Sequence, residues 1–162
     1  MSEKDMFLTE WDREFGTTMK LLKNYPGDKV EMKPSDRSRS AREIAWTFTT
    51  EIGVIDMAIE GKFDFARLSS KPPQSIKELI ASLESASQRM IDRVKNMSTA
   101  DYNSTVKFPV GPGAMADMRK ADVMWFTIKD LIHHRGQFSV YLRMAGGKVP
   151  SIYGPSGDEP WM

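Results

Sequence analysis

Apolar residues recur every three or four positions in four segments of the chain, a spacing that places them on one face of an α-helix. These segments span about residues 3–23, 40–61, 75–96 and 117–145. No long stretch alternates between apolar and polar residues, as a half-buried strand would. Four helices of about 20 residues predict an all-α protein, a four-helix bundle.

Stop and start signals bound these helices. Asn24, Pro26 and Gly27 end the first helix, and Gln74 or Ser75 caps the third, with Glu78 placed for a capping box. The last helix ends at residues 146–147, which are both glycine, with a proline at position 150. Between the third and fourth helices, residues 98–118 form a connection that includes a short extended segment at 105–110.

The connections between the helices are about 16, 13 and 20 residues long, which is more than a tight helical hairpin needs. One or more of them is therefore expected to cross an end of the bundle. The C-terminal residues 149–161 are too rich in proline and glycine for a helix and too apolar to stay free. We expect this tail to pack on one end of the bundle.

Length and charge limit the classes of function. The 162 residues contain 40% hydrophobic side chains, enough for one domain with a core, and we assign residues 1–162 to that domain. A formal net charge of +1 gives no field that would favour nucleic acid or an anionic membrane, so neither is expected as a partner. The chain has no cysteine, so any metal ion must bind to nitrogen and oxygen ligands.

Two features bear on localisation. The N-terminal residues are charged and lack the apolar core of a signal peptide. No run approaches the ~18 apolar residues that a membrane span requires. The expected location is the cytoplasm.

Polar groups interrupt the inner face of the last helix, where the other helices carry leucine and isoleucine. Asp130 and His134 are four residues apart and share that face, whereas His133 is turned about 100° away. A buried polar group without a partner costs roughly 1–3 kcal/mol, so these two must be satisfied. Either they bind each other, Arg135, Tyr141 or water, or both are ligands of a divalent ion.

Three stretches carry a resemblance to a known family. Residues 130–137 read Asp-Leu-Ile-His-His-Arg-Gly-Gln, residues 149–154 read Val-Pro-Ser-Ile-Tyr-Gly, and residues 41–47 read Ala-Arg-Glu-Ile-Ala-Trp-Thr. Together they resemble the DinB/YfiT-like superfamily. The resemblance implies an up-down-down-up order of the four helices and a metal site of three histidines, one in the second helix and two in the last.

Only one of those three histidines is present here. The positions that resemble the family's ligands are Thr47, Asp130 and His134. A hydroxyl is a poor ligand for Ni²⁺ or Zn²⁺ compared with imidazole, so no tightly bound metal is expected. Glu51, one turn after Thr47, could act as an oxygen ligand instead, which would favour a harder ion such as Mn²⁺ or Mg²⁺.

Three further residues are candidates for substrate binding: Tyr141, Arg135 and Tyr153. Arg135 and Arg143 are expected to pair with acidic residues or helix-end carbonyls. The functional alternative is that they bind the carboxylate or phosphate of a substrate. Tyr153 belongs to the tail, and the resemblance places that tail near the metal-site end of the bundle. The alternative is that the tail has only a structural role and covers one end of the bundle.

Two functions follow from the degenerate triad. The first is a non-catalytic protein, stress-associated or binding a small molecule in a cavity at the metal site. The alternative is a metal-dependent enzyme of the thiol S-transferase or hydrolase type, as the resemblance implies for chains with an intact triad. Trp125, Ile128 and Ile132 lie away from the Asp130–His134 face, and for this reason we expect a homodimer.

Overall fold

The computed structural model describes residues 1–161 and is mostly helical, with one small sheet. The long helices are α1 (Glu3–Lys23), α2 (Ala41–Glu60), α3 (Ile76–Asn96) and α5 (Lys120–Met144). Short helices lie between them: η1 (Gly27–Lys29), η2 (Phe65–Leu68) and α4 (Thr99–Tyr102). Strands β1 (Thr105–Gly111) and β2 (Ala114–Arg119) complete the structure.

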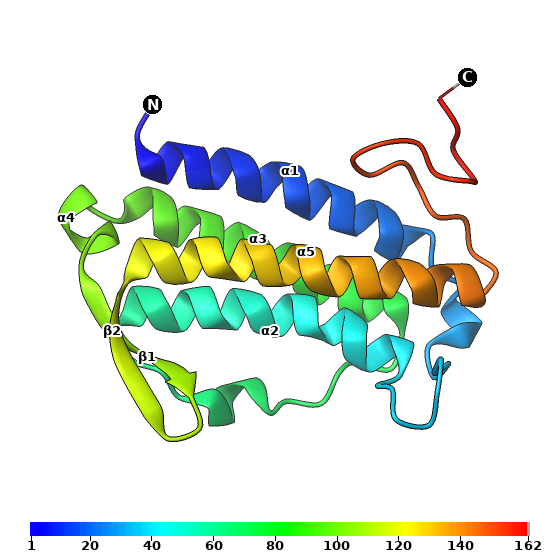
Figure 1. Ribbon diagram of the computed structural model, residues 1–162, viewed down its shortest axis with the longest axis horizontal. Coiled ribbons are helices and arrows are strands. Elements are labelled where there is room, and N and C mark those ends of the chain that lie inside the picture. Colours follow the sequence, from blue (N-terminus) through cyan, green and yellow to red (C-terminus); the bar gives the residue numbers. More distant parts are fainter. Residues whose placement is uncertain (162) are drawn as a thin grey trace.

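The four long helices lie side by side, and Figure 1 shows the direction of each. α1 and α5 run one way, and α2 and α3 run the other way. α5 packs against α1 and α2, and α3 packs against the same two helices on the opposite side. Because α2 and α3 run in the same direction, residues 61–75 must travel back along the bundle, which accounts for the length of that connection.

Serine caps explain where three of the long helices begin. Ser2, Ser40 and Ser75 each accept a hydrogen bond from the backbone N–H three residues later. The acidic side chain at that third position bonds back to the serine N–H, which satisfies two helix-end donors at once. Ser75 is therefore the cap of α3, and the expected capping box with Glu78 is confirmed.

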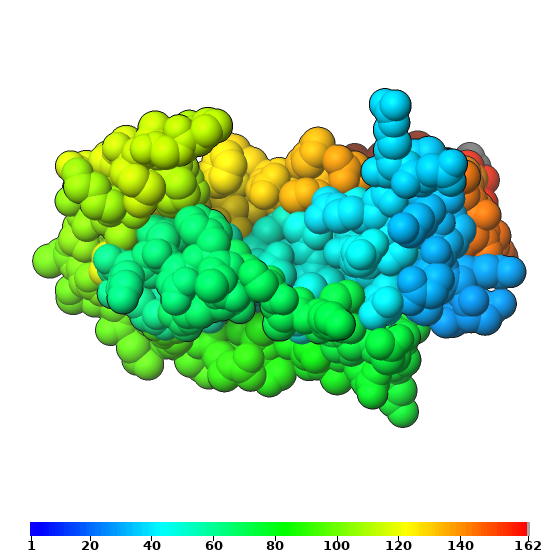
Figure 2. Space-filling view, turned by 90° about the horizontal axis from the view of Figure 1, so that it is seen from below, coloured from blue at the N-terminus to red at the C-terminus, as the bar shows by residue number. Residues whose placement is uncertain are grey.

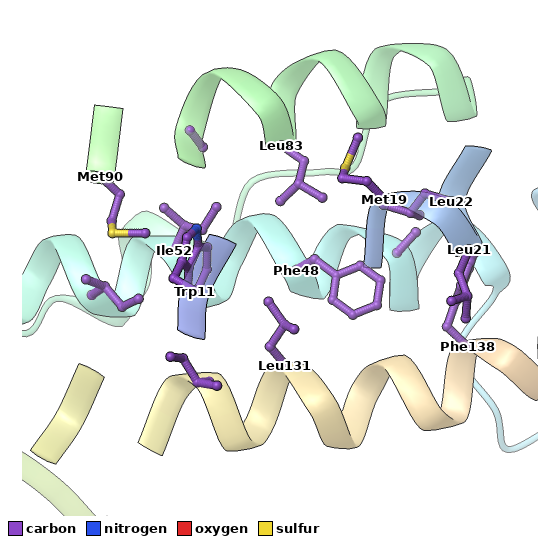
Figure 3. Close-up of a cluster of buried hydrophobic side chains, with 14 of the residues drawn as sticks. Trp11, Met19, Leu21, Leu22, Phe48, Ile52, Leu83, Met90, Leu131 and Phe138 are labelled. Atoms are coloured by element: carbon purple, nitrogen blue, oxygen red, sulfur yellow. The ribbon is translucent and has the colours of Figure 1, made fainter. Parts of the chain in front are cut away.

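The core fills the space between the four long helices (Figure 3). Trp11 is fully buried, and its ring N–H donates to Ser87 Oγ at 2.9 Å, joining α1 to α3. Phe48 of α2 meets Phe138 of α5 edge to face, with ring centroids 6.0 Å apart. These contacts fix the faces that α2 and α5 turn toward each other.

A β-hairpin corrects the all-α prediction. β1 and β2 pair antiparallel, with Thr105 opposite Arg119 and Phe108 opposite Ala116, and Gly113 takes the positive φ of 70° in the turn. The last helix consequently begins at residue 120 and not at 117. The short extended segment expected at 105–110 is the first strand of this hairpin.

α5 is buried on more than one side, because it contacts both α1 and α2. Ile128 is buried, and Trp125 and Ile132 are partly buried and pack against the same core. These three residues thus pack against other residues of the same chain, so they no longer argue for a dimer interface. The homodimer stays a prediction. No helix in residues 1–161 combines the length and apolarity needed to cross a membrane.

The C-terminal tail packs back on the chain. α5 ends as expected: Gly146 adopts a φ of 83°, and the N–H of Gly147 bonds to the Leu142 carbonyl. Asn24 at the end of α1 donates to the Lys148 carbonyl at 3.1 Å, and Val149 is buried. The tail therefore lies against the ends of α1 and α5, beside the helices where Figure 1 draws the C-terminus.

Candidate metal centre between helices α2 and α5

The candidate site lies where α2 and α5 pack against each other. Thr47 and Glu51 are four residues apart on α2, and Asp130 and His134 are four residues apart on α5, so each pair shares a helix face. The structure brings Glu51, Asp130 and His134 together, with one ligand atom of each within 4.8 Å of the others. Figure 2 shows the surface outline dipping near this pair of helices, between the hairpin and the segment before α2.

His134 is at the centre of the cluster. Its Nδ1 lies 2.6 Å from Glu51 Oε1 and 3.7 Å from Asp130 Oδ1. The side chains differ in exposure: Glu51 is 5% exposed, His134 14% and Asp130 40%. Asp130 therefore forms the solvent side of the cluster. The expectation that it lies on the inner face of the bundle is wrong to this extent.

One oxygen of Glu51 has no partner. Glu51 Oε1 bonds to His134, but Oε2 is buried and accepts no hydrogen bond from any described residue. An unsatisfied buried polar group costs roughly 1–3 kcal/mol, and more when it is charged. A cation bound at Oε2 would remove this penalty.

Burial and pairing also shift the protonation of the two partners. Burial raises the pKa of Glu51 from 4.5 to about 7, although the hydrogen bond from His134 opposes this shift. The hydrogen bond to Glu51 raises the pKa of His134. Near neutral pH the pair therefore holds a proton that a bound cation would displace.

The Thr47 hydroxyl is engaged in two hydrogen bonds outside the cluster. It accepts a hydrogen bond from Arg39 Nη1 at 2.8 Å and donates to the Glu43 carbonyl at 3.3 Å. The guanidinium of Arg39 thus lies beside the position that resembles the family's histidine in the second helix. Glu51, which we had considered as a replacement ligand, is the α2 residue that joins the cluster.

The donor set fits a divalent ion. Two carboxylates and one imidazole are ligands of Zn²⁺, Mn²⁺ and Fe²⁺, and the predominance of oxygen favours the harder ions. Ligand atoms around such an ion are about 3–4 Å apart, given bonds of about 2.0–2.2 Å. The distance from His134 Nδ1 to Glu51 Oε1, 2.6 Å, lies just below that range, and the distance from His134 Nδ1 to Asp130 Oδ1, 3.7 Å, lies within it.

A cavity of about 500 Å³ lies one to two turns along α5 from His134. Gln137 and Tyr141 of α5 line one side, and Arg37 and Arg39 line the other. The Tyr141 hydroxyl donates to the backbone carbonyl of Arg39 at 2.9 Å. Of the three residues predicted to bind substrate, Tyr141 is thus the one that lines this cavity.

Arg135 and Tyr153, the other two predicted substrate-binding residues, lie on a different side of α5. Arg135 is buried and pairs with Glu14 of α1 at 2.6 Å. The hydroxyl of Tyr153 accepts from Arg135 and donates to Glu14 at 2.6 Å. The expected pairing of Arg135 with an acid is present, and the tail tyrosine closes this network.

His133 does not join the cluster. It is exposed, and its Nε2 accepts a hydrogen bond from the Gln137 amide at 2.9 Å. The prediction that it points off the inner face is confirmed. The expected ion pair of Arg143 is also present, with Asp158 of the tail at 2.9 Å.

Two residues of these networks were missed in the sequence. Glu14 lies between Trp11 and Thr18 on the buried face of α1. A charged side chain is ordinarily expected at the protein surface, so Glu14 was not considered. The only signal for it was that position on the apolar stripe. Arg39 comes from an irregular segment, for which periodicity gives no placement.

The fold and the cluster define a class of protein: a helical bundle that carries a carboxylate–histidine cluster between two of its helices. The chain belongs to the DinB family, whose sequence pattern matches residues 1–161. This confirms the resemblance inferred from residues 41–47, 130–137 and 149–154.

Similar proteins are found in bacilli. The chain is 28% identical over 156 residues to YrdA of Bacillus subtilis (strain 168), which is described as uncharacterized. This match covers 96% of the chain and 90% of YrdA. The fold of the present chain is similar to that of a DinB-like protein from Bacillus cereus ATCC 10987, with a TM-score of 0.78 and 24% identity. The match covers 91% of this chain and 95% of that one. YjoA of Bacillus subtilis, also DinB-like, gives a TM-score of 0.72 at 14% identity, covering 88% and 94%.

Proposed function

We propose that this protein binds a divalent ion through Glu51, Asp130 and His134 and uses it to hold a small molecule in the adjoining cavity. The observation that carries the proposal is the buried Oε2 of Glu51, which has no partner among the described residues. Three protein ligands leave coordination positions open for a ligand from solvent. A bound ion would polarise whatever group occupied such a position.

The donor set supports an oxygen-preferring ion. A site of three imidazoles suits Ni²⁺ and Zn²⁺, whereas two carboxylates move the preference toward Mn²⁺. Arg39 places a positive charge nearby, which opposes the binding of any cation. We therefore expect moderate affinity and not the tight binding of a three-histidine site.

Calorimetric titration with Mn²⁺, Zn²⁺ and Ni²⁺ at fixed pH tests the proposal. His134→Ala should abolish binding because it removes the only nitrogen ligand of the cluster. His133→Ala is the matched control, since this neighbouring imidazole is exposed and, among residues 1–161, its side chain bonds only to Gln137. Equal loss in the two variants, or no binding by the wild-type protein, would refute the proposed site.

A metal-dependent thiol S-transferase is the second candidate, and the cavity one to two turns along α5 from His134 is the observation that favours it. A cation lowers the pKa of a thiol that binds to it and so increases the fraction of thiolate nucleophile. The test is the rate at which glutathione displaces chloride from a fluorogenic chloride, with and without Mn²⁺. Turnover that His134→Ala abolishes and His133→Ala retains would favour the enzyme.

A further inference from the structure

Two arginines in the segment before α2 have no acidic partner in the part of the chain that the structure describes. Most arginines of the chain pair with a carboxylate, including Arg42, only three residues after Arg39. Within residues 1–161, neither Arg37 nor Arg39 forms an ion pair, and both line the cavity of about 500 Å³. Their charges are therefore available to a ligand in that cavity.

The backbone at Arg39 is held in place from two sides. Tyr141 donates its hydroxyl to the Arg39 carbonyl at 2.9 Å. The next residue, Ser40, is buried and caps α2 through its bond with the Glu43 N–H. From this fixed position the side chain runs along α2, and Nη1 reaches the Thr47 hydroxyl. Arg39 thus lines the cavity and also reaches α2 one turn before Glu51.

Charge at the loaded site would be positive. A divalent ion would be neutralised by the carboxylates of Glu51 and Asp130, which leaves the charge of Arg39, bound at Thr47 one turn before Glu51, uncompensated. Arginine presents a planar fork of donors that matches the oxygen atoms of a carboxylate or phosphate. The combination of an ion with open positions and an adjacent arginine therefore selects an anion.

The remaining walls indicate the size and character of the ligand. Ile44 and Val140 are apolar and line the same cavity, together with the amide of Gln137. A cavity of this volume lies within the range typical of small-molecule sites. An organic anion would use its charged end at Arg39 and its carbon skeleton against the apolar wall.

We propose that the cavity beside the cluster binds a small organic anion, whose carboxylate or phosphate group pairs with Arg39 and completes the coordination of the divalent ion. This inference rests on the proposed metal site, because the anion contacts both the ion and the arginine. Anion and ion then each increase the affinity of the protein for the other, and by linkage the two factors are equal.

The experiment is a titration of the intact protein with Mn²⁺ alone and then in the presence of succinate or methyl phosphate. Binding of Mn²⁺ by each free anion is measured separately and subtracted. In the wild-type protein, at least one anion should raise the affinity for Mn²⁺ about tenfold or more, as a charge-assisted pair does. The two arms distinguish carboxylate from phosphate as the preferred group.

Arg39→Gln should abolish this anion effect and raise the affinity for Mn²⁺ alone, because a repelling charge is removed. Arg89→Gln is the matched control: Arg89 also lacks an acidic partner in the described chain, but it bonds to Ser85 on α3. The control should behave like the wild-type protein. Circular dichroism of both variants checks that each is folded.

The outcomes separate the two proposals. If Mn²⁺ alone does not bind to the wild-type protein, the metal site itself is refuted and this inference with it. If Mn²⁺ binds but neither anion changes its affinity, the anion site is refuted and the metal site stands. An anion effect that persists in Arg39→Gln would likewise overturn the role of this arginine.

Discussion

Glu51→Gln should change how the stability of the metal-free protein depends on pH. Burial raises the pKa of Glu51 from 4.5 to about 7, so the folded chain holds this proton more tightly than the unfolded chain does. The resulting stabilisation is fully present below pH 4.5. It is lost as the pH rises through about 7, where the buried carboxyl must ionise.

The size of the effect follows from the shift. A change of pKa from 4.5 to about 7 corresponds to at most about 3 kcal/mol, at about 1.4 kcal/mol for each tenfold change in proton affinity. In a protein of this size each kcal/mol changes the Tm by about 2–4 °C. The wild-type protein should therefore lose up to roughly 10 °C between pH 5 and pH 8.5 through this residue alone.

Glutamine keeps the shape of Glu51 but cannot ionise, so the variant should lack this loss. Thermal melts in a chelator from pH 5 to 8.5 measure the difference in Tm between the wild-type protein and the variant. Glu84→Gln, a half-exposed position on α3, is the matched control and should follow the wild-type curve. Parallel curves for wild type and Glu51→Gln would show that Glu51 does not titrate in this range.

Two further changes test other parts of the structure. Thr47→His combined with Asp130→His rebuilds three imidazoles, so calorimetry should show at least a ~tenfold gain in Ni²⁺ affinity, which His134→Ala in that background should remove. Deletion of residues 149–161 should lower the Tm by several degrees, as a loss of ~1–2 kcal/mol would, since Tyr153 bonds to α1 and Asp158 pairs with Arg143 of α5. An unchanged melting curve would mean that these contacts contribute nothing to stability.

The sequence predicted the long helices well because their signals are local. Periodic apolar residues and serine caps act within a few residues of each other, and the limits expected for the first helix, 3–23, are those of α1. The second strand, in contrast, reads Ala-Met-Ala-Asp-Met-Arg and has no β-branched residue. It is a strand because it pairs with β1, and such pairing cannot be read from the segment alone.

The site was predictable in the same measure. Asp130 and His134 form an i,i+4 pair within one helix, and Glu51 was found as a position one turn after Thr47. Both inferences use helical spacing only. The contact between Arg39 and Thr47 depends on how an irregular segment folds back on α2, which no period describes.

The buried network of Glu14, Arg135 and Tyr153 allows a last prediction about what holds the tail in place. Arg135 and Glu14 are each at most 2% exposed, and their atoms lie 2.6 Å apart. Although burial would raise it, hydrogen bonds from Tyr153 and Arg135 lower the pKa of Glu14, so the pair stays charged. Glu14→Leu alone should cost about 3–5 kcal/mol in chemical denaturation, because the buried Arg135 is left without its ion-pair partner. Arg135→Met alone should cost less, because Glu14 keeps its pair with Arg13 at 3.1 Å.

The double variant, Glu14→Leu with Arg135→Met, should recover most of that loss, since two apolar side chains of similar volume can replace a buried ion pair at little cost. Tyr153 would then have no partner on the helices, although its hydroxyl could still bond to water. Proteolysis should therefore cut the tail faster in the double variant than in the wild-type protein, even where their free energies of unfolding are similar.

Single variants that cost less than about 1 kcal/mol would instead show that water already reaches the pair. If the double variant is stable and its tail stays protected, the buried ion pair does not hold the tail in place, and the pair of Arg143 with Asp158 must do so.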